Sequence, residues 1–380
     1  MVRTSVRAVA VLALALGLST ACVKGADNTS ASGKDCAVKI SFFGALTGPN
    51  AALGTNIRDG AKLAIDQYNA GKPATCRIEL DLRDSQGDEK LAPGLADAVV
   101  QDAKVIGVVG PSFSGESKAA DGKLSDNGVP IITVATNPSL STKGWKTFHR
   151  ILGNDATQGP AAARYLRDTL KAQKLFVVDD TSEYGKGLAD EVKKTVPPVG
   201  AGTTSKGQTD FSALITQIRA SGADAVYYGG YYAEAGPLLK QLRGQGLKAA
   251  FVAGDAVKDD KFVESAGKEA AEGAILTCPC VPPDKSGGTF AAEFKKAFGS
   301  EPGTYAAEAY DAATIYVAGV KAGKTTRKDM EAFVDAYTGK GVTTTFAFTP
   351  QGELDLSAVA VWAYRVEAGK IVAVQEIPKS

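Results

Sequence analysis

The sequence predicts an α/β protein built from two Rossmann-like lobes, in which parallel sheets are flanked by helices and a hinge joins the lobes. Its 380 residues suggest two domains, because a domain usually holds about 150 residues. Short apolar runs alternate with longer amphipathic segments, which is the pattern of strands and helices in mainly parallel sheets. The alternation restarts after residues 154–157, so we expect a second unit to begin there.

The composition is that of an ordinary globular protein and argues against several function classes. Hydrophobic residues make up 44% of the chain and charged residues 22%, so disorder is not expected. Lysine and arginine number 43 against 42 acidic residues, with no basic block, so no nucleic-acid partner is expected. The single histidine, His149, argues against a histidine-built metal site and against a catalytic triad. We therefore expect no metal, no cofactor and no enzymatic activity.

The N-terminal residues have the pattern of a signal peptide. Arg3 and Arg7 precede an apolar run over residues 8–18, which is too short to span a bilayer but fits the apolar core of such a peptide. The run ends in the sequence LSTAC, whose cysteine is Cys22 and which resembles the lipobox of bacterial lipoproteins. Plain cleavage without lipidation is the alternative.

This pattern predicts residues 1–21 as a lipoprotein signal peptide and Cys22 as the lipidated new N-terminus. Residues 22–36 are mostly small and polar, and we expect them to form the lipid anchor and a flexible tether. The protein would then be exported and held on the outer face of the cytoplasmic membrane.

The strands and helices follow from hydrophobic periodicity. Apolar runs bounded by turn residues predict strands at 38–43, 78–82, 105–109, 130–134, 175–179, 225–228, 250–253 and 274–277. Apolar residues at three-and-four spacing predict helices that include 56–70, 91–103, 158–171, 211–221 and 233–245. The runs 359–366 and 371–377 predict a C-terminal hairpin.

The order of these elements predicts how the chain divides between the lobes. A second break, rich in proline, cysteine and glycine, falls at 278–285, and helical segments resume after it. We assign 37–152 plus 284–348 to lobe 1 and 153–283 plus 349–380 to lobe 2. Small ligands bind in clefts between hinged lobes, so the site is expected there.

Four cysteines remain for disulfides in an exported protein. Cys36 and Cys76 each precede a predicted strand, and neighbouring parallel strands would bring these starts together, so we predict this pair. Cys278 and Cys280 would then close a very small ring or stay reduced, and the sequence leaves both possibilities open.

Four collinear segments resemble one known family. They are GALTGP at 44–49, DATQGP at 155–160, YGKGL at 184–188 and DAVYYGGY at 224–231. Their order and spacing are similar to those of the branched-chain amino-acid binding proteins of ABC importers. The resemblance implies a type I periplasmic-binding-protein fold, a monomer that closes on one amino acid and delivers it to the ABC permease subunits.

The resemblance also suggests where the ligand carboxylate binds. Ser114 follows a predicted strand and opens a helix, so its hydroxyl and nearby N–H groups could hold an anion, although it could equally cap the helix. It falls on the family's carboxylate-binding serine. Val134, Ala135 and Thr136, at the end of the next strand, match the segment whose carbonyls and threonine contact the ligand; Thr136 could instead be a turn residue.

The ligand ammonium requires an acceptor on the other side of the cleft. Asp255, just past a predicted strand, stands where the family usually has a glutamate; the alternative is that it caps the following helix. Tyr184 and Tyr231 match aromatic residues that cover the ligand, with core packing as their alternative. Tyr305 falls on a further aromatic position of the family's pocket.

Two departures from the family bear on ligand size. Leu53 stands where a pocket tyrosine is often found, and Phe113 replaces a much smaller residue. If Phe113 points inward, it should favour small aliphatic ligands such as valine or alanine. A receptor or sensor for amides, urea or another small polar solute on the same fold is the alternative. A third class, an exported oxidoreductase or hydrolase, finds no supporting motif.

Overall fold

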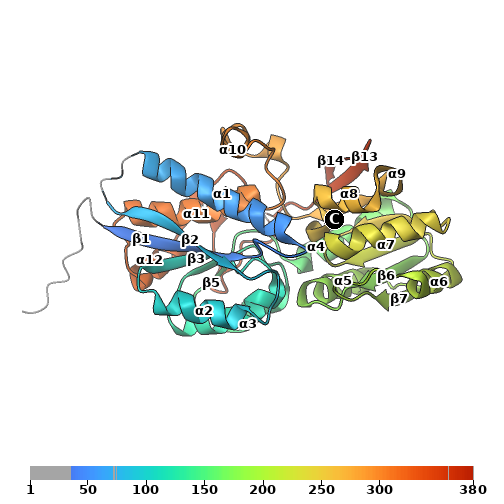
Figure 1. Cartoon of the computed structure of the whole chain (residues 1–380), viewed down its shortest axis with the longest axis horizontal. Coiled ribbons are helices and arrows are strands. Elements are labelled where there is room, and N and C mark those ends of the chain that lie inside the picture. The colour runs from blue at the N-terminus through green and yellow to red at the C-terminus, as the bar shows by residue number, and fades with distance from the viewer. Residues whose placement is uncertain (1–35, 72, 74, 358, 380) are drawn as a thin grey trace, which may run out of the picture. The chain divides into compact units, whose positions relative to one another are not determined.

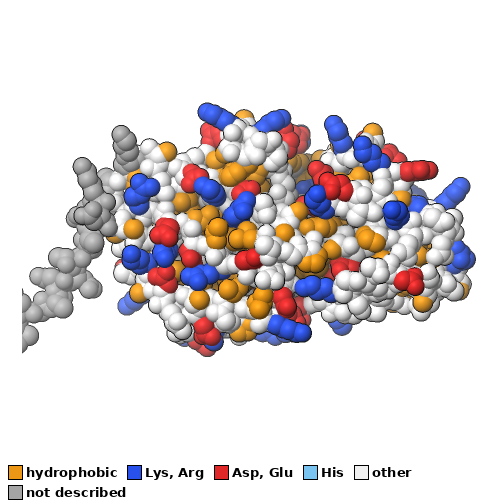
Figure 2. Space-filling model, in the orientation of Figure 1, with side chains coloured by type: hydrophobic (Ala, Val, Ile, Leu, Met, Phe, Trp, Pro, Cys, Tyr) orange, Lys and Arg blue, Asp and Glu red, His pale blue; other side chains and the backbone are white. Residues whose placement is uncertain are grey.

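The computed structural model describes residues 36–71, 73, 75–357 and 359–379. The predicted signal peptide, Cys22 and nearly all of the predicted tether lie outside these residues. No helix in the described part of the chain has both the length and the apolar character needed to cross a bilayer. Figure 2 shows basic and acidic side chains intermixed over the visible face, without a patch of one sign.

A five-stranded parallel sheet forms from the first part of the chain (Figure 1). Its strands, in spatial order, are β2 (Arg77–Asp84), β1 (Ala37–Gly44), β3 (Val105–Val109), β4 (Ile131–Thr133) and β5 (Phe148–Arg150). Every residue of β3, with the sequence VIGVV, is buried. Such a continuous apolar run suits a central strand that helices cover on both faces.

A second, seven-stranded sheet follows. In spatial order it contains β14 (Lys370–Glu376), β13 (Trp362–Glu367), β10 (Ile275–Cys278), β9 (Ala250–Ala253), β8 (Ala225–Gly229), β6 (Leu175–Asp179) and β7 (Gly200–Thr203). Strands β6, β7, β8, β9 and β10 are parallel to one another. Strand β13 runs antiparallel to β10, and β14 runs antiparallel to β13. The last two strands form the predicted C-terminal hairpin. A separate two-stranded sheet pairs β11 (Thr338–Lys340) with β12 (Thr345–Ala347).

The helices cover these two sheets. They are α1 (Ala51–Ala70), α2 (Ala92–Gln101), α3 (Ser114–Asp126), α4 (Asp155–Arg164), α5 (Glu183–Thr195), α6 (Ser212–Ser221), α7 (Tyr232–Gly244), α8 (Asp260–Ala266), α9 (Lys268–Ala271), α10 (Phe290–Phe298), α11 (Ala306–Lys321) and α12 (Arg327–Asp335). Short 3-10 helices span Pro138–Thr142, Asp255–Val257 and Pro283–Lys285, and a π-helical turn spans Tyr165–Thr169.

Packing assigns the late helices to the first sheet. Helix α11 packs along α1 and against β3, and α12 packs against α11 and β3. Helices α4 to α9, by contrast, pack among themselves and against strands of the second sheet. The chain therefore passes from the first sheet to the second after β5, returns after β10, and passes over again after β12. The lobe bounds given above remain a prediction.

The two sheets share a strand order that positions the site. The five-stranded sheet has the order 2-1-3-4-5, and β7-β6-β8-β9-β10 repeats this order in the second sheet. In open α/β sheets of this kind, ligands bind outside the carboxyl ends of the strands, near the point where the order reverses. The segments after β3, β4, β6, β8 and β9 are therefore the expected binding segments.

Both pairs of cysteines in the described residues form disulfides. The predicted Cys36–Cys76 bond is present and joins the starts of β1 and β2, with the two Cα atoms 4.6 Å apart. Cys278 and Cys280 are also bonded to each other, which answers the question that the sequence left open. Both of these latter cysteines are buried where the chain leaves β10.

Candidate ligand-binding site

One small cavity lies between segments of the two sheets and brings together all the predicted ligand-binding residues. It is lined by Leu53, Ser112, Phe113, Ser114, Val134, Ala135, Thr136, Tyr184, Tyr231, Asp255, Ala256 and Tyr305. Most of these residues follow the carboxyl end of a strand, as the shared strand order leads one to expect. The cavity volume is about 20 Å³. This is room for about one water molecule, so a larger molecule can enter only if the two sides separate.

Ser114 lies on the side of the five-stranded sheet and is the first residue of α3. Its hydroxyl oxygen accepts a hydrogen bond from the backbone N–H of Asn137 at 3.2 Å. Ser114 is 1% exposed. Phe113, not Ser114, occupies the N-cap position. The alternative interpretation of Ser114 as the cap of this helix is therefore wrong.

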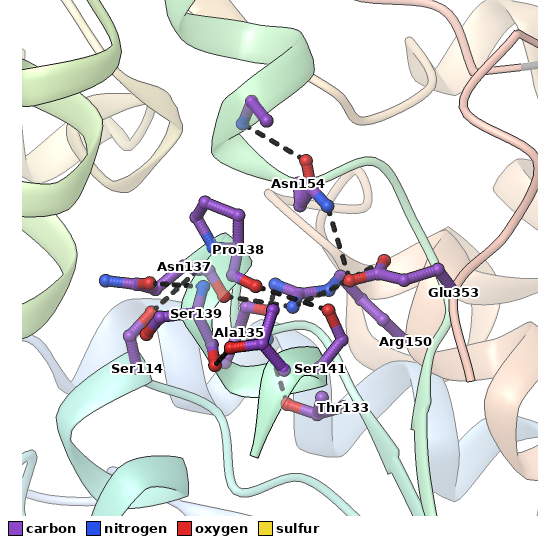
Figure 3. A network of polar contacts seen from close by, with 12 residues as sticks. Ser114, Thr133, Ala135, Asn137, Pro138, Ser139, Ser141, Arg150, Asn154 and Glu353 are labelled. Carbon is purple, nitrogen blue, oxygen red and sulfur yellow. Dashed lines mark hydrogen bonds and ion pairs between the residues drawn. The ribbon is translucent and has the colours of Figure 1, made fainter. Parts of the chain in front are cut away.

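The segment after β4 is held in place by a buried arginine. Arg150, at the end of β5, donates hydrogen bonds to the backbone carbonyls of Ala135 and Asn137 (Figure 3). The amide N–H of Ala135 in turn donates to the Thr133 hydroxyl at 2.9 Å. These contacts orient the three-residue segment 134–136, which lines the cavity.

The same arginine forms a buried ion pair with Glu353, in the segment where the chain passes from the first sheet to the second for the last time. Its Nε and Nη2 atoms each lie 3.1 Å from an oxygen of Glu353, and the arginine is 0% exposed. Asn154, which caps α4, donates to Glu353 at 3.3 Å (Figure 3). One charged pair thus connects β5, the start of α4 and the segment before β13.

Asp255 lies on the opposite side and is surrounded by tyrosines. It begins the 3-10 helix after β9, is 2% exposed, and accepts hydrogen bonds from the hydroxyls of Tyr184, at 2.8 Å, and Tyr305. Burial raises its carboxyl pKa above the usual value, although the hydrogen bonds that it accepts oppose this. Asp259, not Asp255, caps the next helix α8, so the capping interpretation of Asp255 is wrong.

A second buried carboxylate, Asp155, lies close enough to interact electrostatically with Asp255. It is the first residue of α4, and its backbone N–H donates to the Thr136 carbonyl at 2.9 Å. Both carboxylate oxygens are buried and accept no hydrogen bond from the described residues. Burial, followed by the negative charge of Asp255, raises the pKa of Asp155 well above its ordinary value. The charge of Arg150 acts on Asp155 and that of Lys258 on Asp255, but neither carboxylate forms a direct salt bridge with another described residue.

Aromatic rings close the cavity on its remaining sides. The Tyr231 ring lies 4.9 Å from the Phe113 ring and 5.2 Å from the Tyr184 ring, measured between centroids. Phe113 therefore does point inward. Phe113 and Tyr231 also line a larger polar pocket of about 330 Å³ next to the cavity, so this ring pair separates the two spaces.

Polar contacts tie the two sides together around the cavity. Lys118 on α3 forms an ion pair with Glu183 of α5 at 2.8 Å, and the Asn137 side chain donates to the Glu183 carbonyl at 2.7 Å. On another flank, the Ala52 N–H donates to the Tyr232 hydroxyl at 3.2 Å. The structure therefore represents a closed arrangement of the site.

Comparison with known proteins identifies the family. A family described as periplasmic binding protein matches residues 37–369. The chain belongs to this family. The α/β fold predicted from the sequence is that of the type I periplasmic binding proteins, and both the predicted fold class and the stated resemblance are confirmed. The family is one of exported solute-binding proteins.

Curated relatives of this periplasmic binding protein are named for amino acids. It is 34% identical over 348 residues to the Leu/Ile/Val-binding protein BraC3 of Rhizobium johnstonii, covering 89% of this chain and 94% of the relative. It is 33% identical over 340 residues to the leucine-, isoleucine-, valine-, threonine- and alanine-binding protein of Pseudomonas aeruginosa, covering 87% and 91%.

A solved structure shows the same fold in a liganded protein. The substrate-binding protein LivJ of a branched-chain amino acid transporter from Streptococcus pneumoniae, in complex with isoleucine, superimposes with a TM-score of 0.82 at 28% identity. The match covers 89% of this periplasmic binding protein and 99% of LivJ.

Sequence reasoning missed Asp155 and Arg150. Asp155 begins the family segment at 155–160 and the predicted second unit, but no ligand role is predicted for it; an acidic residue at the first turn of a helix beside the predicted cleft is the signal that indicates one. Arg150 lies beside the apolar residues Phe148, Ile151 and Leu152, which suggests a buried charge that needs a partner. Nothing in the sequence indicated that this partner is Glu353, about two hundred positions along the chain.

Proposed function

We propose that this protein is the extracytoplasmic receptor of an ABC importer and that it binds a free, small aliphatic amino acid in the cavity. The observation that carries this proposal is that groups suited to bind a negative charge and a group suited to bind a positive charge lie on opposite sides of the site. Ser114 and segment 134–136 line one side of the cavity, and the buried carboxylate of Asp255 lines the other. Asp155 does not line the cavity but adjoins segment 134–136 through its hydrogen bond to the Thr136 carbonyl.

This arrangement suits a zwitterion. The Ser114 hydroxyl and the backbone N–H groups beside it would donate to the ligand carboxylate at the start of α3, where the helix dipole favours an anion. The ligand ammonium would supply a positive charge directly to Asp255, whose side-chain hydrogen bonds come from the uncharged hydroxyls of Tyr184 and Tyr305. A buried carboxylate without such a partner is unfavourable, so binding and closure support each other.

Ring packing sets the size of the ligand side chain. Phe113 and Tyr231 leave little space in the closed arrangement, so we infer that alanine or valine fits better than leucine. The Pseudomonas relative is named for leucine, isoleucine, valine, threonine and alanine, so its name supports a pocket that accepts small side chains but not one that excludes leucine. We further infer that the two lobes close about the crossings near Gly153, Pro279 and Glu353 and present the closed form to the ABC permease as a monomer.

Calorimetric titration of the purified protein with the twenty amino acids tests this function. We expect saturable binding of alanine or valine, and an Asp255→Ala variant should weaken it by about 2–4 kcal/mol, as for the loss of a buried charge partner. Asp126→Asn, a change at an exposed aspartate on α3, serves as a control and should leave the affinity unchanged. Binding of amides or urea, with no amino acid bound, would favour the alternative receptor instead.

We also propose that residues 1–21 are removed and that Cys22 carries the lipid anchor. The small residues before this cysteine support the proposal. Expression of the full chain in a bacterium fed labelled palmitate should give a labelled, membrane-associated protein, and Cys22→Ala should lose the label. An unlabelled wild-type protein would contradict lipidation.

A further inference from the structure

A cluster of metal-binding side chain types lies outside the ligand cavity, between the edge of the five-stranded sheet and α12. It contains His149 on β5 and Glu331 and Asp335 on α12. The available ligand atoms of the three side chains lie within 4.8 Å of one another. Glu331 and Asp335 are four positions apart on one helix, so they project from the same face.

The histidine is oriented toward the carboxylates. His149 is 1% exposed; its Nδ1 faces the Ile131 carbonyl oxygen at 3.2 Å, and its Nε2 lies 3.0 Å from an oxygen of Asp335. Either a proton on Nε2 or a metal ion shared with Asp335 makes this contact favourable, and with the proton on Nδ1 the Nε2 lone pair is available to a metal ion. Metal-binding histidines commonly donate their other N–H to a backbone carbonyl in this way.

Glu331 provides the independent observation. Both of its carboxylate oxygens are buried and accept no hydrogen bond from the described residues. No lysine or arginine in the described part of the chain pairs with either carboxylate. A charged, buried group without a partner is unfavourable, and a cation at this point would compensate it.

We propose that His149, Glu331 and Asp335 bind a divalent transition-metal ion, and that Zn²⁺ fits best. One nitrogen and two carboxylate oxygens would supply three ligands, with a water as the fourth, and the two carboxylates would balance the charge of the ion. Imidazole favours zinc over Mg²⁺ and Ca²⁺, which prefer oxygen ligands. The Asp335 side chain is 59% exposed, so the site opens to solvent.

The expectation of no metal site rested on the chain having one histidine. Two carboxylates one helical turn apart, together with a strand histidine distant in sequence, supply a ligand set that no local motif reveals. The ion would fasten α12 to β5.

Titration of the chelator-treated protein with ZnCl₂ tests the proposal. We expect one zinc ion per chain by calorimetry and a rise of several degrees in the unfolding temperature at saturating zinc, because a ligand that binds the folded state stabilises it. MgCl₂ at the same concentration should give no shift.

Variants then locate the site. Loss of even a supporting contact costs metal sites about 10–100-fold in affinity, so Glu331→Gln and Asp335→Asn should each weaken zinc binding by at least about tenfold. Asp126→Asn is the matched control and should retain wild-type zinc affinity. Circular dichroism checks that each variant is folded. Cobalt in place of zinc gives a second readout, a visible absorption band that both variants should lose.

Two outcomes would overturn the proposal. One is the absence of saturable zinc binding to the wild-type protein. The other is wild-type zinc affinity in both folded variants, which would place any bound ion elsewhere. Neither outcome bears on amino-acid binding, because the cluster shares no residue with the cavity.

Discussion

Single side chains decide which ligand the cavity admits, and Phe113 is the one most open to test. Its ring lies against Tyr231 and divides the small cavity from the larger polar pocket. Phe113→Ala should join the two spaces, so we expect the ratio of leucine to alanine affinity to rise by at least about tenfold, as for one or two added methylenes in an apolar pocket. Calorimetry with both ligands measures this ratio.

A matched control separates size from general damage. Phe298→Ala removes a phenylalanine that packs on α10, away from the cavity, and should leave the ratio unchanged. If the ratio stayed constant in Phe113→Ala as well, the ring would not be limiting ligand size.

For single residues, the sequence predicted which side chains line the cavity better than it predicted which groups they form hydrogen bonds with. All ten predicted cavity residues line one space, because the family segments and the ends of the strands pointed to them. The order and identity of residues cannot show that Asp155 has two unpartnered buried oxygens, since this depends on what α4 is packed against. The roles proposed for these residues in binding remain predictions.

Among the elements, the short strand β5 carries more charge than its place in the sheet suggests. Its Arg150 pairs with Glu353 inside the protein. Glu353→Gln leaves a buried guanidinium without its counter-charge, so we expect a loss of roughly 3–5 kcal/mol in the free energy of unfolding, measured with urea.

The double variant Arg150→Met, Glu353→Leu tests the physical reason. Removal of both charges should destabilise the protein less than removal of Glu353's charge alone, because no unpaired ion remains. A double variant as unstable as the sum of two single variants would show that the hydrogen bonds to the Ala135 and Asn137 carbonyls, rather than the ion pair, dominate.

The elements that sequence analysis missed share a cause. β5 contains a histidine and an arginine, and the edge strand β7 reads Gly-Ala-Gly-Thr, so neither has an apolar run. The short pair β11 and β12 likewise lacks one. Their strand geometry comes from pairing with neighbouring strands, which tertiary structure supplies. Central strands, with apolar residues on both faces, were predicted close to their observed bounds.

For the whole molecule, several buried carboxyls predict how stability depends on pH. Burial raises the pKa of Glu116 to about 7, that of Glu308 to about 7 and that of Asp180 to about 6. The folded protein thus holds more protons than the unfolded chain at intermediate pH. The stability contributed by these groups is present at low pH and is lost as pH rises through the folded values.

We therefore expect the ligand-free protein to unfold at a higher temperature near about pH 5.5 than near about pH 8. Thermal melts in matched buffers measure this. Glu116→Gln should flatten the profile, whereas Glu264→Gln, a change at an exposed glutamate on α8, should not. A higher unfolding temperature at pH 8 than at pH 5.5 would contradict the prediction.

The repeated passage of the chain between its two sheets has a practical consequence. Because the chain crosses after β5, after β10 and after β12, we expect the two sheets to move apart as a hinge opening, which would separate contacts such as Lys118 with Glu183. A pair of fluorescent dyes attached beside that contact would then register occupancy as one change in transfer efficiency. The labelled protein could in this way serve as a fluorescent sensor for the concentration of its own ligand.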